Sequence, residues 1–111
     1  MNVGSISGFE GQRGQIDYAA SKGAVMAMTM PMARELIRYN VRVVGIAPGL
    51  FKTDMYHKMG ERVRNKIEQS SVLGRFGNPR EFALFIKSII ENGYLTGVNL
   101  RLDGGTLLPK L

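Results

Sequence analysis

The sequence predicts an α/β protein that forms part of a doubly wound parallel sheet. Segments 41–47 and 97–103 have the β-branched or alternating pattern of strands, and residues 1–5 are typical of the end of another strand. Two segments of helical periodicity, 17–39 and 79–92, lie between them. Strands that alternate with helices indicate a parallel sheet, and such sheets carry helices on both faces.

The first half of the chain contains one long predicted helix. The strand end at residues 1–5 has a single strong strand former and is followed by a glycine-rich segment, 6–16, which predicts a loop. The helix predicted over 17–39 is rich in Ala and Met, and Asn40 is a suitable stop. Because proline lacks the amide hydrogen that a helix interior needs, we expect a kink at Pro31.

The second half alternates strand and helix signals. The strand at 41–47 ends at a Pro-Gly pair, a loop is expected over 48–60, and a short polar helix over 61–70. Asn78 is a suitable N-cap, and a proline follows it at the first helical position of the next helix. The final strand is predicted over 97–103, and a tail follows it.

Composition excludes several classes of protein. The chain has no cysteine, so disulfides, thiolate metal sites and cysteine nucleophiles are excluded, and the single histidine, His57, has no evident partners for a metal site. The net charge is +6, but basic residues are interleaved with acidic ones and no aromatic platform motif accompanies them, so no nucleic-acid partner is predicted. A solvated basic surface is the main interpretation, and contact with an anionic ligand is the alternative.

Tyr18 and Lys22 are the first candidates for chemistry. Their i, i+4 spacing places them on one face of a helix. A phenol ordinarily has a pKa of about 10, and a neighbouring ammonium lowers it by favouring the phenolate, which makes tyrosine a better general acid or base. Taken alone, Tyr-x-x-x-Lys also arises by chance, and two exposed residues on an ordinary helix are the alternative.

Three further features support a shared site. Ser5 lies at the end of the first predicted strand, thirteen residues before Tyr18. The segment APGLFKT, 47–53, directly follows a strand, so its backbone lies at the carboxyl edge of the sheet, where open α/β sheets bind ligands. The segment LDGG, 102–105, closes the last strand. In this order and spacing the motifs resemble the short-chain dehydrogenase/reductase family.

Longer stretches indicate one branch of that family. GFEGQRGQIDYAASKGA, TMPMAREL, IAPGLFKT and LRLDGG are similar to the branch that acts on 3-hydroxyacyl-CoA and hydroxysteroids, and the resemblance extends over essentially all 111 residues. It implies a Rossmann-type fold and an NAD-dependent oxidoreductase, with NADP not excluded, that acts on a secondary alcohol or ketone of a small-molecule substrate.

The resemblance also implies roles for individual residues. Ser5 would orient the substrate carbonyl or hydroxyl, Tyr18 would transfer the proton, and Lys22 would lower the pKa of the tyrosine and bind the ribose of the cofactor. Tyr18 would share in this cofactor contact. The residues that would contact the nicotinamide end are Pro48, Gly49, Leu50 and Thr53. Besides Ser5, the residues that would line an apolar substrate pocket are Phe51, Met55, Tyr56 and Met59, for which packing within a loop is the alternative.

The chain contains neither G-x-G-x-x-G nor a P-loop motif. Residues 1–111 are therefore expected to be one partial domain, the C-terminal, catalytic and substrate-side part of the sheet, with the N-terminal dinucleotide-binding half absent. The isolated chain is expected to be inactive, and the competing hypothesis is a non-catalytic fragment that associates with a full-length homologue.

Location and assembly are also predicted. With no apolar run of membrane-spanning length and no signal-like N-terminus, the chain is expected to be soluble, not secreted and without a membrane partner. The resemblance implies mitochondria or the cytoplasm. It also implies a homo-oligomer in which the Tyr18 helix packs at a subunit interface, and this fits the small residues on that helix, which are Ala20, Gly23, Ala24 and Ala27.

Overall fold

A three-stranded parallel sheet forms the centre of the computed structural model, which describes residues 1–106. The strands are β1 (Asn2–Val3), β2 (Val44–Pro48) and β3 (Val98–Leu102), and they lie side by side in sequence order. Asn2 pairs with Gly45, and β2 pairs with β3 from Val44↔Val98 to Pro48↔Leu102. The predicted parallel α/β fold is therefore confirmed.

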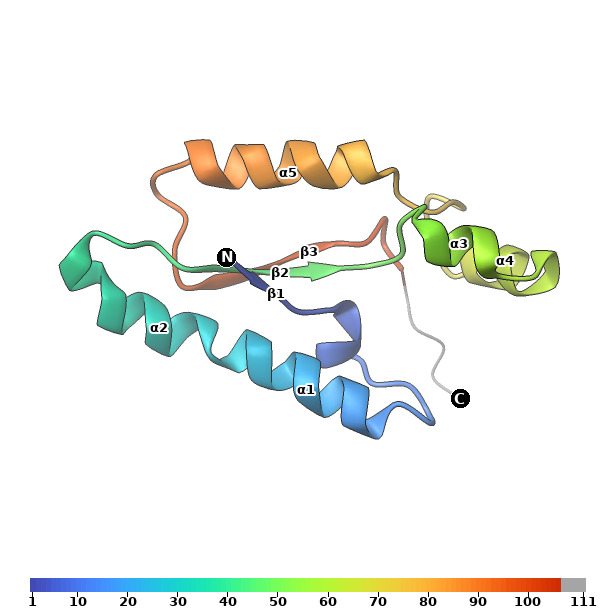
Figure 1. Ribbon diagram of the computed structural model, residues 1–111, viewed down its shortest axis with the longest axis horizontal. Helices are drawn as coiled ribbons and strands as arrows, with labels where there is room; N and C mark the ends of the chain where they lie inside the picture. The colour runs from blue at the N-terminus through green and yellow to red at the C-terminus, as the bar shows by residue number, and fades with distance from the viewer. Residues whose placement is uncertain (107–111) are drawn as a thin grey trace.

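Helices cover both faces of this sheet (Figure 1). Helices α1 (Ile16–Ala27) and α2 (Thr29–Leu36) lie on one face, and α5 (Pro79–Glu91) lies on the other. On the α5 side, the buried side chains of Val44, Ile46 and Ile89 form one apolar cluster. On the α1 side, the buried residues that form a second cluster are Ile6, Met26 and Ala47.

The long helix predicted over 17–39 is divided into three pieces. Helix α1 ends at Ala27, α2 begins at Thr29, and a short 3-10 helix, η2 (Ile37–Tyr39), follows α2. The break lies one turn before Pro31, because this residue has no amide hydrogen to donate to the carbonyl of Ala27. Asn40 ends the run in a left-handed conformation, with φ of 58°, as a helix stop requires.

Two segments predicted to be loops contain short helices. A 3-10 helix, η1 (Ile6–Gly8), lies within the glycine-rich segment, and α3 (Asp54–Lys58) lies within the segment that follows β2. Sequence periodicity cannot detect helices of three to five residues, because one turn carries too few apolar positions. The predicted polar helix is α4 (Glu61–Glu68), and with α3 it extends beyond the end of the sheet (Figure 1).

Helix α5 begins and ends on specific side-chain contacts. The Asn78 side chain accepts a hydrogen bond from the amide of Arg80, and the Glu81 carboxylate accepts one from the amide of Asn78. At the other end, the Arg42 guanidinium donates to the carbonyls of Ile89, Ile90, Asn92 and Leu95. The predicted Asn-Pro start is confirmed. The predicted tail lies largely outside the described residues, and no helix within residues 1–106 is long and apolar enough to cross a membrane.

Candidate active site

Ser5 lies directly after β1, at the carboxyl edge of the sheet. Its side chain is buried, and its hydroxyl oxygen accepts a hydrogen bond of 3.1 Å from the amide of Ser7, so Ser5 caps η1. The preceding residue, Gly4, donates its amide to the carbonyl of Ile46 in β2 at 2.8 Å. Ser5 is therefore held on one side by the amide of Gly4, which bonds to the sheet, and on the other by its own hydroxyl, which bonds to η1.

Helix η1 packs directly on the backbone of α1. A Cβ atom on Gly8 would lie 3.0 Å from the amide nitrogen of Gly23 and 3.0 Å from the carbonyl carbon of Lys22. That distance is tighter than most real Cβ contacts, so this approach favours glycine at position 8. The short helix that Ser5 caps is thus placed against the turn of α1 that carries Lys22.

Lys22 links α1 to the end of β1. Its ammonium donates a hydrogen bond of 3.2 Å to the carbonyl of Val3, two residues before Ser5. The same ammonium lies 5.9 Å from the centre of the Tyr18 ring, which is 43% exposed. Asp17, in the first turn, interacts favourably with the helix N-terminus. Tyr18 and Lys22 therefore lie on one face of α1, at the edge of the sheet where β1 ends.

The segment after β2 lies beside the end of β3. Gly49 donates its amide to the carbonyl of Leu102 at 2.9 Å, and a Cβ atom on Gly49 would lie 2.7 Å from the Cβ of Asp103. Only glycine fits this crossing without movement of the neighbouring chain. Pro48 is the last residue of β2, and Thr53 precedes α3.

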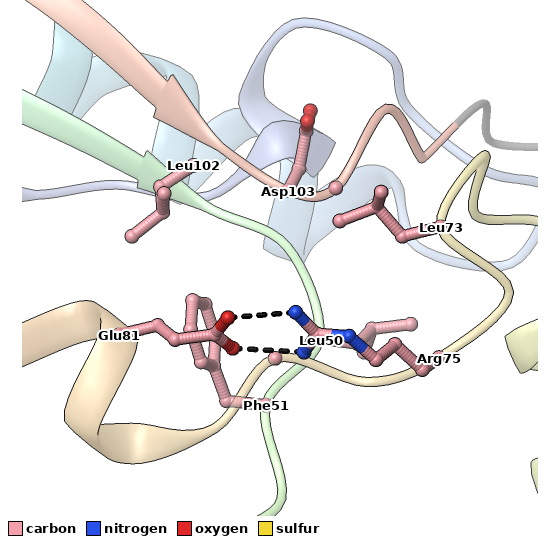
Figure 2. Close-up of a pocket in the computed structure, with 9 residues that line it drawn as sticks. Leu50, Phe51, Leu73, Arg75, Glu81, Leu102 and Asp103 are labelled. Atoms are coloured by element: carbon pink, nitrogen blue, oxygen red, sulfur yellow. Dashed lines mark hydrogen bonds and ion pairs between the residues drawn. The ribbon is translucent and has the colours of Figure 1, made fainter.

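A pocket of about 80 Å³ lies between these strand ends and the start of α5 (Figure 2). Leu50, Phe51 and Leu73 supply apolar atoms, and Asp103 and the paired Arg75 and Glu81 supply polar ones. Of the predicted site residues, the structure brings Leu50 and Phe51 together here. Among the described residues, Ser5, Tyr18 and Lys22 do not line this pocket.

The four residues predicted to line a substrate pocket lie in different surroundings. The ring of Phe51 packs edge-on against Phe82 of α5, with ring centres 5.5 Å apart. The ring of Tyr56 packs against the buried Phe76 at 4.8 Å. Met55 is 67% exposed, and Met59 is half-buried. The two aromatic side chains therefore anchor the segment around α3 to the body of the chain.

Two ion-pair networks lie near the strand ends, and the sequence did not single them out. Arg75 and Glu81 form a two-bond pair at 2.8 and 2.7 Å, and this pair with the amide of Asn78 lowers the pKa of Glu81 to about 2. Arg101 contacts Glu10 and Asp103, which raise its pKa above the usual range. No local motif identifies such partners, because the contacts depend on the fold.

Several proteins of known type are similar in sequence to this chain. The profile of the family described as short chain dehydrogenase matches residues 1–64. The chain is 47% identical to mouse 3-hydroxyacyl-CoA dehydrogenase type-2 over 105 residues, which are 94% of this chain and 40% of that protein. It is 42% identical to the 3-oxoacyl-[acyl-carrier-protein] reductase of Thermotoga maritima over 111 residues, covering 97% of this chain and 45% of that protein.

A solved structure agrees with these matches. The crystal structure of 3-hydroxyacyl-CoA dehydrogenase type-2 from Mycobacterium avium superimposes with a TM-score of 0.92 at 39% identity, over 96% of this chain and 42% of that one. The chain therefore spans about two fifths of the length of these relatives. The family profile covers more than half of the chain and the fold agrees with it, so the chain belongs to the short-chain dehydrogenase family.

Proposed function

We propose that this chain supplies the proton-transfer part of an NAD-dependent oxidoreductase that acts on a secondary alcohol or ketone, either a 3-hydroxyacyl-CoA or a hydroxysteroid. The observation that carries the proposal is the packing of η1, capped by Ser5, on the turn of α1 that holds Lys22. In the proposal, the hydroxyl of Ser5, the phenol of Tyr18 and the ammonium of Lys22 act together at the carboxyl edge of a parallel sheet, where such sheets bind ligands.

Each of the three residues has a distinct role in the proposal. Tyr18 exchanges a proton with the oxygen of the substrate, since its ring is open to solvent and an ammonium lies 5.9 Å from it. Lys22 would bind the ribose of the cofactor through its ammonium. Ser5 orients the substrate oxygen, because its hydroxyl lies on a segment fixed to both β2 and η1.

The residues present fit the nicotinamide end of the cofactor. A lysine ammonium has three donors, and one of them is held by the carbonyl of Val3. Lys22 with Tyr18 would hold the ribose hydroxyls, and the backbone from Pro48 to Leu50, with Thr53, would contact the nicotinamide. When bound, the cofactor supplies hydride transfer. NADP remains an alternative to NAD.

Activity is tested by joining the N-terminal part of the mouse relative in front of residues 1–111. Formation of NADH is followed with a 3-hydroxyacyl-CoA and, separately, with a hydroxysteroid. We expect turnover of at least one substrate, and Tyr18→Phe should reduce it roughly 10²- to 10⁴-fold because the hydroxyl that exchanges the proton is lost. NADH binding should weaken far less, because Lys22 and the backbone from Pro48 to Leu50 would still contact the cofactor.

Tyr94→Phe is the matched control, since Tyr94 is 99% exposed and carries the same hydroxyl far from the proposed chemistry in the sequence. Its turnover should equal that of the unmodified enzyme. The proposal is wrong if the assembled enzyme binds NADH but turns over neither substrate, or if Tyr18→Phe keeps a large share of the turnover.

A second candidate function is association without catalysis. Ala20, Ala24 and Ala27 are exposed on α1, whereas Gly23 packs against η1. A helix face of small exposed residues allows close approach of another helix, either from a second copy or from a full-length homologue. Sedimentation of the chain alone and mixed with the mouse relative tests this, and a chain that stays monomeric in both samples would contradict it.

A further inference from the structure

Arg101 of β3 connects the last strand to the segment that leads into α1. Its guanidinium contacts the Glu10 carboxylate at 2.5 Å and the Asp103 carboxylate at 2.7 Å, and it donates to the carbonyl of Thr106 at 3.2 Å. Glu10 and Arg101 are 91 residues apart in the sequence. Asp103 in turn accepts a hydrogen bond from the amide of Gly105, so the carboxylate that flanks Arg101 is itself fixed.

The direction of the Arg101 side chain follows from the alternation of β3. Val98 and Leu100 pack on the α5 side of the sheet, so Asn99 and Arg101 face the α1 side. Asn99 confirms this direction, since its amide donates to the carbonyl of Met26 in the last turn of α1 at 3.0 Å. Two alternate residues of β3 therefore reach the two ends of the α1 region.

Glu10 lies in the segment that joins η1 to α1. The amides of Phe9 and Glu10 both donate to the carbonyl of Ile6, and the amide of Gln15 donates to the carbonyl of Gln12 immediately before α1. Main-chain contacts within the segment are therefore local, and the contact with Arg101 connects it to the sheet. This segment joins η1, which Ser5 caps, to the start of α1, which carries Tyr18.

We propose that Arg101 is a positioning residue. Through Glu10 it fixes the segment 9–15 against β3, and so holds the start of α1, with Tyr18, in a fixed position relative to Ser5. This inference rests on the proposed function for its catalytic consequence, but not for its structural part. Arg101 is 37% and Glu10 36% exposed at the side chain, so the pair is screened in part by water. A planar guanidinium shared by two carboxylates is nevertheless geometrically more specific than a single exposed ion pair.

Amide hydrogen exchange of the 111-residue chain tests the structural part. The variants are Glu10→Gln, Arg101→Gln and the double variant, and the readout is exchange within residues 9–15. We expect each single variant to raise exchange roughly threefold to tenfold. The double variant should exchange no faster than the faster single variant, because the two side chains act through each other. Lys87→Gln, which removes the exposed pair with Glu91 on α5, is the control and should leave this exchange unchanged.

Kinetics of the assembled enzyme test the catalytic part. Arg101→Gln should lower kcat roughly tenfold and leave the KM for NAD unchanged, and Arg101→Lys should restore part of the loss because the charge is kept. The proposal is overturned if exchange in residues 9–15 equals that of the unmodified chain, if the variant effects simply add, or if kcat is unchanged while exchange rises. If the assembled enzyme has no turnover at all, the proposed function fails and the exchange experiment still decides the positioning role.

Discussion

At the scale of single residues, Lys22 is the side chain of the proposed site that makes contacts in two directions. Its ammonium donates to the Val3 carbonyl and lies 5.9 Å from the centre of the Tyr18 ring. In the assembled enzyme, Lys22→Ala should lower turnover and weaken NADH binding together, because the proposed ribose contact is lost. Titration with NADH and a turnover assay measure these effects, with Lys87→Ala as the control. Unchanged NADH affinity would contradict the role in ribose binding.

Gly45 in β2 is required for a packing reason. A Cβ atom there would collide with the Asn99 side chain and lie 2.7 Å from the Thr29 hydroxyl, which is fully buried. We expect Gly45→Ala to lower the free energy of unfolding by about 1–3 kcal/mol, as for other overpacked cores. Urea unfolding measures the loss. In combination with Asn99→Ala the cost should be less than the sum of the two single variants, since the colliding atoms are gone. If the two losses of unfolding free energy simply add, the collision at Gly45→Ala is relieved by atoms other than those of Asn99.

At the scale of elements, the start of α5 is predicted to respond to pH. Arg75 and the amide of Asn78 stabilise the ionised Glu81, so its pKa is about 2 in the folded chain against an ordinary glutamate value of 4.5. A depressed carboxyl pKa contributes stability above the unfolded value, and this contribution is lost as pH falls from about 4.5 toward 2. The unfolding midpoint of the unmodified chain should therefore be higher than that of Glu81→Gln above pH 5, and the two midpoints should converge near pH 2. A constant difference across that range would exclude this linkage.

At the scale of the whole molecule, we expect the chain to provide only part of a dinucleotide-binding site. Within residues 1–106 the sheet has three strands, and the sequence has no glycine-rich phosphate-binding turn. A dinucleotide would make few of the contacts needed to offset the entropy lost on binding. We therefore expect no saturable NADH binding by the 111-residue chain at micromolar concentrations, whereas the assembled enzyme should bind. Calorimetric titration of both proteins checks this, and micromolar binding by the short chain would overturn it.

Local interactions explain what the sequence by itself determined. The order of strands and helices follows from hydrophobic periodicity, the start of α5 follows from Asn78 and Pro79, and the shared face of Tyr18 and Lys22 follows from helical spacing. These features depend on residues close together in the chain. The division at Met28 was predicted only as a kink, because Pro31 marks a helix defect without fixing its place.

Only the tertiary structure decided which distant residues meet. The contact of Lys22 with the Val3 carbonyl, the contact of Arg101 with Glu10, and the crowding around Gly45 all depend on strand order and register. Two polar side chains 91 residues apart carry no local pattern that marks them as partners. Their meeting is fixed when the parallel strands pair and α1 packs on the sheet, because burial of the apolar faces sets the register for every side chain on them.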